Sequence, residues 1–364
     1  MAKKILISGY YGFNNSGDDA ILKILVDQLK LIEYPVEIVA LSNNVEQTEL
    51  EYKVRAINRY NLSTIIKEMK DCDLFISGGG TLLQDGTSNR SLYYYLTILK
   101  LAKKYCYKTM IFANGMGPIK SKFNKKLTKN LLEQVDYITL RDYNSLEFLK
   151  TLGLRNKNVE VTFDPVFMMK PIDDFKILEI FKEENINIDK KCIAISVRNW
   201  DHLDDIKDNV VNLIKKLEMN FEILLVPMQH PNDDILSKNI IKMSKCKDIK
   251  ILKNHYNADE LIGIMSKMDY VIAMRYHALI YATISQIPIT AIEYDPKVGG
   301  LMKMLNIDSV CSMAQIETRK LCNIVEKGLA NKDESIEKLE LGHNEKFQSA
   351  YRNIEIIRGL LEDN

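Results

Sequence analysis

The stretch that decides the fold is ILISGYYGFNNSGDD, which occupies residues 5–19. Its first four residues, Ile5–Ser8, are a short apolar run that predicts a buried strand. A loop rich in glycine and asparagine follows, and the spacing of apolar residues over Asp18–Leu31 predicts a helix. We therefore expect a strand whose carboxyl end passes directly into a polar loop and then into a helix.

The same alternation of short apolar runs and longer amphipathic stretches continues along the chain. In the first half, strands are expected at Ile5–Ser8, Val36–Leu41, Leu74–Ser77, Thr109–Ala113 and Tyr137–Leu140, and helices at Asp18–Leu31, Leu62–Met69, Ser91–Lys104, Phe123–Gln134 and Tyr143–Leu152. In the second half, strands are expected at Cys192–Val197, Ile223–Val226, Ile249–Leu252, Tyr270–Ala273 and Ile287–Ile292, and helices at Ile206–Leu217, Asp234–Met243, Ala258–Ser266 and Ala278–Ser285. Such alternation predicts an α/β fold with parallel sheets and helices on both faces.

Two doubly wound domains are expected. A chain of 364 residues suits two domains, since one domain typically has about 100–200 residues. Proline-containing breaks at 164–165 and 170–171 interrupt the alternation and indicate the boundary. We predict a Rossmann-like domain over residues 1–170, a second over 171–340 that faces it across a cleft, and a helix in 341–364 that packs back on the first.

Composition excludes several classes of protein. Hydrophobic residues make up 46% and charged residues 27%, which is typical of globular proteins and not of disordered or fibrous ones. Lysine and arginine total 50 against 49 for aspartate and glutamate, so bulk charge argues against a nucleic-acid partner. No apolar run is long enough to span a membrane, and Lys3-Lys4 runs into the first strand without a signal peptide. The 6 cysteines form no CxxC pair, which favours reduced thiols in a cytoplasmic protein.

Chemistry in this class of fold is expected in the loops at the carboxyl ends of the strands. In the first half, those loops hold Asn14, Asn15, Asp18, Gly79, Gly80, Asp85, Arg90, Asn114 and Arg141. In the second half, they hold Arg198, Arg275, His277 and Lys297. Glycines allow close approach of a ligand to the backbone, and arginines bind phosphate and carboxylate groups through two hydrogen bonds. The loop at 9–19 is neither GxGxxG nor a Walker P-loop, so it predicts no dinucleotide or nucleoside triphosphate.

Each of these residues also has a purely structural interpretation. Ser16 or Asp18 could cap the first helix. Arg141 could form a surface ion pair with the residue that follows it, and His277 could be a satisfied core histidine. Arg275 lies two positions before His277 at a strand-to-helix junction, which favours a functional role for both.

One helix carries a stripe of positive charge. Lys122, Lys125, Lys126 and Lys129 fall on one face of the helix expected at Phe123–Gln134. A solvated face is the simpler interpretation. The alternative is peripheral contact with anionic lipid headgroups or with a lipid diphosphate.

Together these motifs resemble those of the bacterial polysaccharide pyruvyl transferases, and most of all the CsaB type, which modifies secondary cell-wall polysaccharide for S-layer attachment. The resemblance covers residues 9–298 and rests on the loop 9–19, the run Ser77-Gly78-Gly79-Gly80 through Asp85, Leu140-Arg141-Asp142, Ile195–Trp200, Arg275-Tyr276-His277-Ala278 and Tyr294-Asp295-Pro296-Lys297. The family's Arg-x-His motif corresponds to Arg275 and His277. The first loop ends in Asp18-Asp19 where Asp-Glu is expected.

The resemblance implies a GT-B-like fold of two Rossmann-like domains, with the acceptor on the first and the donor on the second. It implies phosphoenolpyruvate as the donor substrate and a ketal formed on two hydroxyls of one sugar, with release of phosphate. For the CsaB type, the acceptor would be N-acetylmannosamine on a lipid diphosphate carrier, ketalised at its 4- and 6-hydroxyls. No metal or other cofactor is expected, and no metal-ligand spacing such as HExxH is present.

The candidate residues take these roles in the implied reaction. Arg141, Arg275 and His277 are expected to be catalytic, with His277 as the general acid. The donor is expected to be bound by Arg141, Arg275, His277, Arg198 and Lys297. The acceptor is expected to be bound by Asn14, Asn15, Asp18, Gly79, Gly80, Asp85, Arg90 and Asn114. The general base stays open among Asp18, Asp85 and Asp164.

Two alternative functions compete with this interpretation. A GT-B nucleotide-sugar glycosyltransferase would share the fold, but retaining members often carry two glutamates about eight positions apart. Glu293 has Gly300 and Leu301 where its partner would lie. A non-catalytic sugar- or lipid-carrier-binding protein would have no use for Arg141, Arg275 and His277 together.

Overall fold

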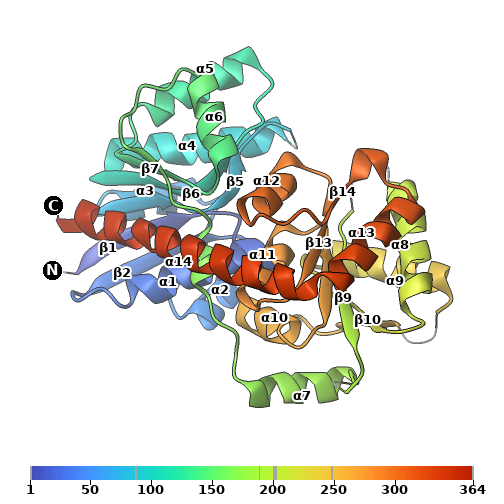
Figure 1. The fold of residues 1–364 in the computed structure, drawn as a ribbon. Helices are drawn as coiled ribbons and strands as arrows, with labels where there is room; N and C mark the ends of the chain where they lie inside the picture. Colours follow the sequence, from blue (N-terminus) through green and yellow to red (C-terminus); the bar gives the residue numbers. More distant parts are fainter. Residues whose placement is uncertain (1, 87, 188, 200–202, 247–248, 363–364) are drawn as a thin grey trace. The chain divides into compact units, whose positions relative to one another are not determined.

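The computed structural model describes residues 2–86, 88–187, 189–199, 203–246 and 249–362. The chain divides into two compact units (Figure 1). Unit 1 comprises Met1–Met168 and Lys346–Asn364, and unit 2 comprises Met169–Glu345. Each unit contains its own parallel sheet and its own hydrophobic core.

The sheet of unit 1 has the strand order β3-β2-β1-β4-β6-β7-β8, and β5 pairs with β6. Its strands are β1 Lys3–Ser8, β2 Val36–Ser42, β3 Arg55–Asn58, β4 Leu74–Ser77, β5 Gly80–Leu83, β6 Lys108–Met116, β7 Tyr137–Leu140 and β8 Val159–Val161. Its helices are α1 Ser16–Leu29, α2 Val45–Tyr52, α3 Leu62–Met69, α4 Asn89–Tyr105, α5 Lys122–Leu132, α6 Tyr143–Thr151 and the 3-10 turn η1 Pro165–Met168. Every paired strand runs parallel, so the carboxyl ends of β1, β4, β6 and β7 share one edge.

Successive residues of each strand face opposite sides of the sheet in unit 1, because the side chains of a strand alternate. Leu6, Phe75 and Ile138 lie in one buried cluster with apolar residues of α3, α4, α5 and α6. Thr139, the neighbour of Ile138, faces the other side, and its Oγ1 donates a hydrogen bond at 2.6 Å to Asn353 Oδ1 of α14 (Lys332–Glu362). On this second face, Thr139 is therefore covered by a residue that lies 214 positions away in the sequence.

Unit 2 has a six-stranded sheet in the order β11-β10-β9-β12-β13-β14, the order of a doubly wound nucleotide-binding fold. Its strands are β9 Cys192–Ser196, β10 Glu222–Leu225, β11 Ile249–Ile251, β12 Tyr270–Ala273, β13 Ile289–Glu293 and β14 Val310–Ser312. Its helices are α7 Asp174–Glu184, α8 Leu203–Leu217, α9 Asn232–Ser244, α10 Ala258–Met265, α11 Tyr276–Ile284, α12 Pro296–Met304, α13 Thr318–Ala330 and the 3-10 turn η2 Met313–Gln315. Buried residues of α8, α9 and α13 pack on one face of the sheet.

Most of the expected elements are present, and several agree to the residue. Leu74–Ser77, Tyr137–Leu140 and Tyr270–Ala273 are strands with the predicted bounds. The missed elements are short ones, namely β3, β5, β8, β14, α2 and α12. The placement of Gly80 in a loop is wrong, because Gly80–Leu83 forms β5 and pairs with β6.

The helix expected at His343–Leu361 is the second half of a longer helix, α14, which begins at Lys332 and ends at Glu362. It belongs to unit 2 up to Glu345 and to unit 1 from Lys346 onward. In unit 1, Asn353 Oδ1 also contacts Thr162 Oγ1 at 2.8 Å. Within the described part of the chain, every helix is too short or too polar to cross a lipid bilayer.

Candidate functional site

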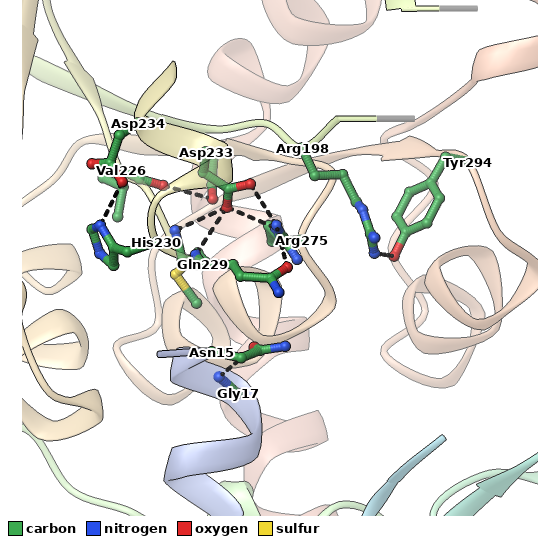
Figure 2. Close-up of polar contacts among 12 residues, drawn as sticks. Asn15, Gly17, Arg198, Val226, Gln229, His230, Asp233, Asp234, Arg275 and Tyr294 are labelled. Atoms are coloured by element: carbon green, nitrogen blue, oxygen red, sulfur yellow. Dashed lines mark hydrogen bonds and ion pairs between the residues drawn. The ribbon is translucent and has the colours of Figure 1, made fainter. Parts of the chain in front are cut away.

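In unit 2, the best-defined polar cluster lies at the carboxyl ends of β10 and β12. Arg275 follows β12 at the first position before α11, and its side chain is buried. Its Nε donates to Asp233 Oδ2 at 2.9 Å and its Nη2 donates to Asp233 Oδ1 at 2.5 Å, which makes a two-fold ion pair (Figure 2). Nη2 also donates to Gln229 Oε1 at 3.2 Å. Among the described residues, Nη1 of this guanidinium has no hydrogen-bond partner and is the group left for a ligand.

Asp233 is held as firmly as the arginine that it binds. Its side chain is 0% exposed, and Oδ2 accepts hydrogen bonds from the backbone N–H groups of Met228 and Gln229 at 3.1 and 3.0 Å. A fully buried carboxylate is stable only when it is paired and hydrogen-bonded, and here four donors meet that need. The loop between β10 and α9 therefore fixes the orientation of Arg275.

The neighbouring residue in α9, Asp234, contacts a histidine through one of its carboxylate oxygens. His230 Nδ1 lies 2.6 Å from Asp234 Oδ2 (Figure 2). The ring of His230 also packs edge-to-face on His255, with 4.6 Å between the ring centroids. Burial and the adjacent His230 lower the pKa of His255. Two consecutive aspartates at the start of α9 thus orient one arginine and one imidazole.

His277 lies in the first turn of α11, two positions after Arg275. It is half-buried, and its ring packs against Tyr276 at 5.4 Å and against Tyr281 at 6.5 Å. A helix N-terminus favours bound anions, since its backbone N–H groups point outward there. The sequence placed Arg275 and His277 at a strand-to-helix junction, and the structure has them there.

A second cationic group surrounds Tyr294 at the carboxyl ends of β9 and β13. Arg198 Nη1 donates to Tyr294 Oη at 2.9 Å, and the guanidinium also lies over the ring at 4.9 Å (Figure 2). Lys297, in the first turn of α12, places Nζ 5.7 Å from the same ring centroid. Burial alone would raise the pKa of Tyr294, but Lys297 and Arg198 outweigh it and lower the pKa. Trp200, quoted with Arg198 in the sequence, lies outside the described residues.

In unit 1, the loop after β1 is shaped by unusual backbone angles. Asn14 has a φ of +53°, and Gly12 has a φ of +74°, a region that favours glycine. The side chain of Asn15 accepts a hydrogen bond from Gly17 N at 3.2 Å and caps α1. Neither Ser16 nor Asp18 is the cap, so that structural interpretation of the loop is corrected.

The loop is packed by Tyr11, whose ring lies where a side chain at Gly9 or Gly78 would otherwise be. Tyr11 is buried, its hydroxyl has no hydrogen-bond partner among the described residues, and burial together with Asp18 raises its pKa well above the usual value. Asp18 Oδ1 lies 2.8 Å from the position that a Cβ at Gly80 would take. Glycines at these three positions therefore let the first loop and the triple-glycine run approach each other.

Arg141 lies at the carboxyl end of β7 and is buried rather than at the surface. Its Nη2 donates to Thr81 Oγ1 at 2.6 Å, and its Nε lies 3.5 Å from Asp142 Oδ2. Asp142 is buried too and caps α6 through Ser145 N at 2.7 Å. The structural alternative, a surface ion pair between Arg141 and Asp142, is right about the partner and wrong about exposure, because both side chains are buried.

The backbone of β6 approaches the Arg141 guanidinium closely. A Cβ at Gly115 would lie 2.8 Å from both Nε and Nη2 of Arg141. Asn114, one residue earlier, is 0% exposed and donates through Nδ2 to Gly78 O at 3.1 Å, while its Oδ1 has no partner among the described residues. Asn114 and Arg141 thus belong to one polar cluster at the carboxyl edge of the unit 1 sheet.

Two further predicted residues of unit 1 differ in their surroundings: Asp85 is bound by several hydrogen bonds, and Arg90 is exposed. Asp85 accepts from Lys120 N at 2.7 Å, Ser121 N at 3.2 Å and Asn124 Nδ2 at 2.9 Å. Burial opposes ionisation of Asp85, but these hydrogen bonds outweigh it and lower the pKa. Arg90 is exposed in the first turn of α4.

The predicted residues Gly79 and Gly80, and the general-base candidate Asp164, are buried in unit 1. A Cβ at Gly79 would lie 3.0 Å from Ile21, so this glycine packs against α1. Gly80 starts β5 with a φ of +88°. Asp164 is buried and accepts from Val166 N at 3.1 Å, just before η1.

Sequence reasoning missed three well-placed residues. Asp233 and Gln229 lie after β10, where no loop motif was recognised, although the acidic pair Asp233-Asp234 at a helix start was a usable signal. Arg59, after the unrecognised strand β3, is buried, donates through Nη1 to Gly9 O at 2.9 Å and lies over the ring of Tyr94 at 4.4 Å. Within the described residues, no group of three or more His, Cys, Asp or Glu side chains is arranged to hold a metal ion.

Comparison with known proteins places this arrangement in context. The family model for polysaccharide pyruvyl transferase matches residues 15–296. The amylovoran biosynthesis protein AmsJ of Erwinia amylovora is 22% identical over 373 residues, which cover 86% of this chain and 88% of that protein.

Solved structures share the fold at low sequence identity. A glycosyltransferase from Rickettsia africae superposes with a TM-score of 0.67 at 14% identity, over 100% of both chains. HepE from Anabaena, in complex with UDP-glucose, superposes with a TM-score of 0.67 at 12% identity, over 99% of this chain and 100% of that one. These likenesses establish an α/β fold of the GT-B-like type for this chain.

Proposed function

Because this chain belongs to the polysaccharide pyruvyl transferase family, we propose that it moves a pyruvyl group from phosphoenolpyruvate onto two hydroxyls of a cell-wall sugar. The coarser statement, a transferase of polysaccharide biosynthesis, follows from the family itself and agrees with the relative AmsJ. The donor, the ketal product and the acceptor sugar are the proposal.

The observation that carries the proposal is the set of cations at the carboxyl edge of the unit 2 sheet. Arg275, Arg198 and Lys297 follow β12, β9 and β13, and β9 and β12 are direct neighbours in that sheet. Phosphoenolpyruvate carries a phosphate and a carboxylate on three carbons, so it needs fixed positive charge at two points. Arginine supplies that charge at any working pH and binds such groups through paired hydrogen bonds. In this proposal, the free Nη1 of Arg275 binds the donor.

In the proposed chemistry, the oxygens of two sugar hydroxyls become bonded to C2 of the donor. A proton goes to the methylene carbon, C2 becomes electrophilic, and a sugar hydroxyl forms a C–O bond to it while losing its own proton. Phosphate then leaves with the C2–O bond pair and takes up a proton, and the second hydroxyl forms a C–O bond to C2 and loses its own proton, which closes the ketal. His277 is proposed as the general acid, since an imidazole changes protonation state near neutral pH. No cofactor enters this scheme.

The acceptor is proposed to bind at the carboxyl edge of the unit 1 sheet. Asn114 and Asp18 lie there among glycines that allow close approach, and Arg141 is proposed to act on the donor from the same cluster. In the CsaB-type version of the proposal, the acceptor is N-acetylmannosamine on a lipid diphosphate, and the product serves S-layer attachment. Phosphoenolpyruvate is an intracellular metabolite, so the reaction is proposed to take place in the cytoplasm.

The test is the identity of the products. The purified protein is incubated with phosphoenolpyruvate and candidate acceptors, including N-acetylmannosamine glycosides and lipid-linked precursors. Released phosphate is measured, and acceptors are examined by mass spectrometry for a gain equal to pyruvate less one water. Acceptor-dependent phosphate with that gain supports the proposal. Release of a nucleoside diphosphate from a sugar nucleotide, without phosphate from phosphoenolpyruvate, supports a glycosyltransferase instead.

A further inference from the structure

The helix α5 presents a basic face with one exposed aromatic side chain. Its eleven residues include Lys122, Lys125, Lys126 and Lys129, and its sequence KFNKKLTKNLL contains no acidic residue. In the sequence, Phe123 follows Lys122, the first of these lysines, and its side chain is 67% exposed. Among the described residues, none of the four lysines is in an ion pair. We call Phe123 and the four lysines the basic–aromatic face.

The orientation of this face is fixed by the opposite side of the helix. Asn124, Thr128, Leu131 and Leu132 are buried, and the last two lie in the unit 1 core. Asn124 also accepts a hydrogen bond from Tyr93 Oη at 2.9 Å. A rotation of α5 that hid Phe123 would expose these residues, so the exposure of Phe123 follows from the packing of the helix.

The start of α5 is joined to the loop that follows β5. Asp85 binds the backbone N–H groups of Lys120 and Ser121 just before the helix, and Asp85 N donates to Pro118 O at 3.1 Å. The basic–aromatic face therefore begins next to the carboxyl edge of the unit 1 sheet. A molecule held at this face would lie near the polar cluster of the same unit.

From this arrangement we propose that the basic–aromatic face of α5 binds an anionic lipid surface, with Phe123 inserted among the acyl chains. A large exposed aromatic residue gains free energy by leaving water, and lysines close to a negatively charged membrane are attracted to its headgroups. A soluble polyanion without bases, such as a sulfated polysaccharide, would be bound by the lysines and would not contact Phe123 through an apolar group. The proposal does not depend on the reaction catalysed.

The test is co-sedimentation with lipid vesicles, in the absence of substrates. The full chain is expected to bind vesicles of phosphatidylglycerol and phosphatidylcholine, to bind pure phosphatidylcholine far less, and to release at high salt, because exposed charges are screened. Lys125→Glu with Lys126→Glu is expected to weaken binding by at least about tenfold. Phe123→Ser is expected to weaken vesicle binding by about tenfold and to leave binding to a heparin column unchanged.

Matched controls test whether any similar change has the same effect. Phe175 in α7 is 69% exposed, and Lys190 and Lys191 are an exposed lysine pair outside α5. Phe175→Ser, and Lys190→Glu with Lys191→Glu, are expected to bind vesicles as the unmodified chain does. Equal vesicle binding by Phe123→Ser and the unmodified chain would overturn the proposal. Loss of heparin and vesicle binding in parallel, from the lysine changes alone, would assign the face to a soluble polyanion.

Discussion

Asp233 grips Arg275 through both carboxylate oxygens, Oδ2 to Nε at 2.9 Å and Oδ1 to Nη2 at 2.5 Å, with Asp233 fully buried. Two of the three guanidinium nitrogens of Arg275, the residue predicted to bind the donor, are thus already hydrogen-bonded to Asp233. Only part of its guanidinium remains to meet a phosphate or carboxylate, and Asp233 decides which part.

Asp233→Asn should therefore impair both folding and donor binding. Breaking a buried ion pair by removing one partner costs about 3–5 kcal/mol, so the free energy of unfolding should fall by about that amount. With Arg275 no longer oriented, KM for phosphoenolpyruvate should rise by about tenfold or more while the acceptor KM changes little. Denaturant titration and steady-state kinetics measure the two effects. Asp208→Asn, at an exposed position in α8, is the control and should change neither.

His277→Ala should separate chemistry from binding. General acid catalysis contributes about 10²–10⁴-fold, so kcat for phosphate release should fall within that range while phosphoenolpyruvate affinity is largely retained. The side chain is half-buried and lies beside the rings of Tyr276 and Tyr281, where an alanine can be accommodated, so the melting temperature should shift little. Near-normal turnover in this variant would remove His277 from the role of general acid.

Gly115→Ala should lower turnover as Arg141→Ala does, although the residue at position 141 is unchanged. The added Cβ would lie 2.8 Å from Nε and Nη2 of Arg141 and 2.8 Å from Thr81 Oγ1, so the hydrogen bond between these two side chains must be disturbed. We expect turnover to fall at least about tenfold, as in Arg141→Ala, because displacement by about 1 Å is costly for a positioned group. Gly359→Ala is the matched control, since a Cβ there meets nothing within 4 Å. If Gly115→Ala were fully active and Arg141→Ala inactive, the observed position of Arg141 would not be the one used in the reaction.

Glu68 should make the protein lose stability in acid. Hydrogen bonds from Arg55 are the main reason that its pKa is lowered from 4.5 to about 2; burial opposes this shift, and a hydrogen bond from Lys4 adds to it. Because the folded pKa lies below the unfolded one, the stabilisation is present above pH 4.5 and is lost as pH falls from 4.5 to about 2. It amounts to about 3 kcal/mol at 1.36 kcal/mol per pKa unit. Glu68→Gln should flatten the decline of unfolding free energy measured by urea titration between about pH 6 and pH 3.

The sequence predicted those parts of the fold that depend on hydrophobic periodicity. Tyr270–Ala273 is a run of apolar residues before a polar junction, so both the strand and the location of Arg275 and His277 after it could be predicted. β3 could not, because only Ala56 and Ile57 of its four residues are buried and the run is too short to show a period. Arg59, which follows β3, was therefore missed with it.

The partners of the candidate residues were harder to predict than the residues themselves. Nothing in the spacing of Asp233 and Arg275, which lie 42 positions apart, indicates that they form an ion pair. Their contact depends on the order of β10, β9 and β12 in the sheet, which is a property of the whole unit. Likewise, nothing in the spacing indicates that Arg141, predicted as a catalytic and donor-binding residue, is buried against the backbone of Gly115.

The helix α14 also has a consequence for how the protein is synthesised. Unit 1 is made of two pieces of chain, and Asn353 supplies the side-chain partner of both Thr139 and Thr162. A ribosome releases residues 1–168 long before residue 346, so Thr139 and Thr162 emerge without their partner Asn353 while all of unit 2 is still being made. Synthesis of unit 1 therefore begins first and is completed last. Ile354 is fully buried in this last segment. A chain truncated before Ile354 should leave part of the first sheet exposed to solvent and should be prone to aggregate.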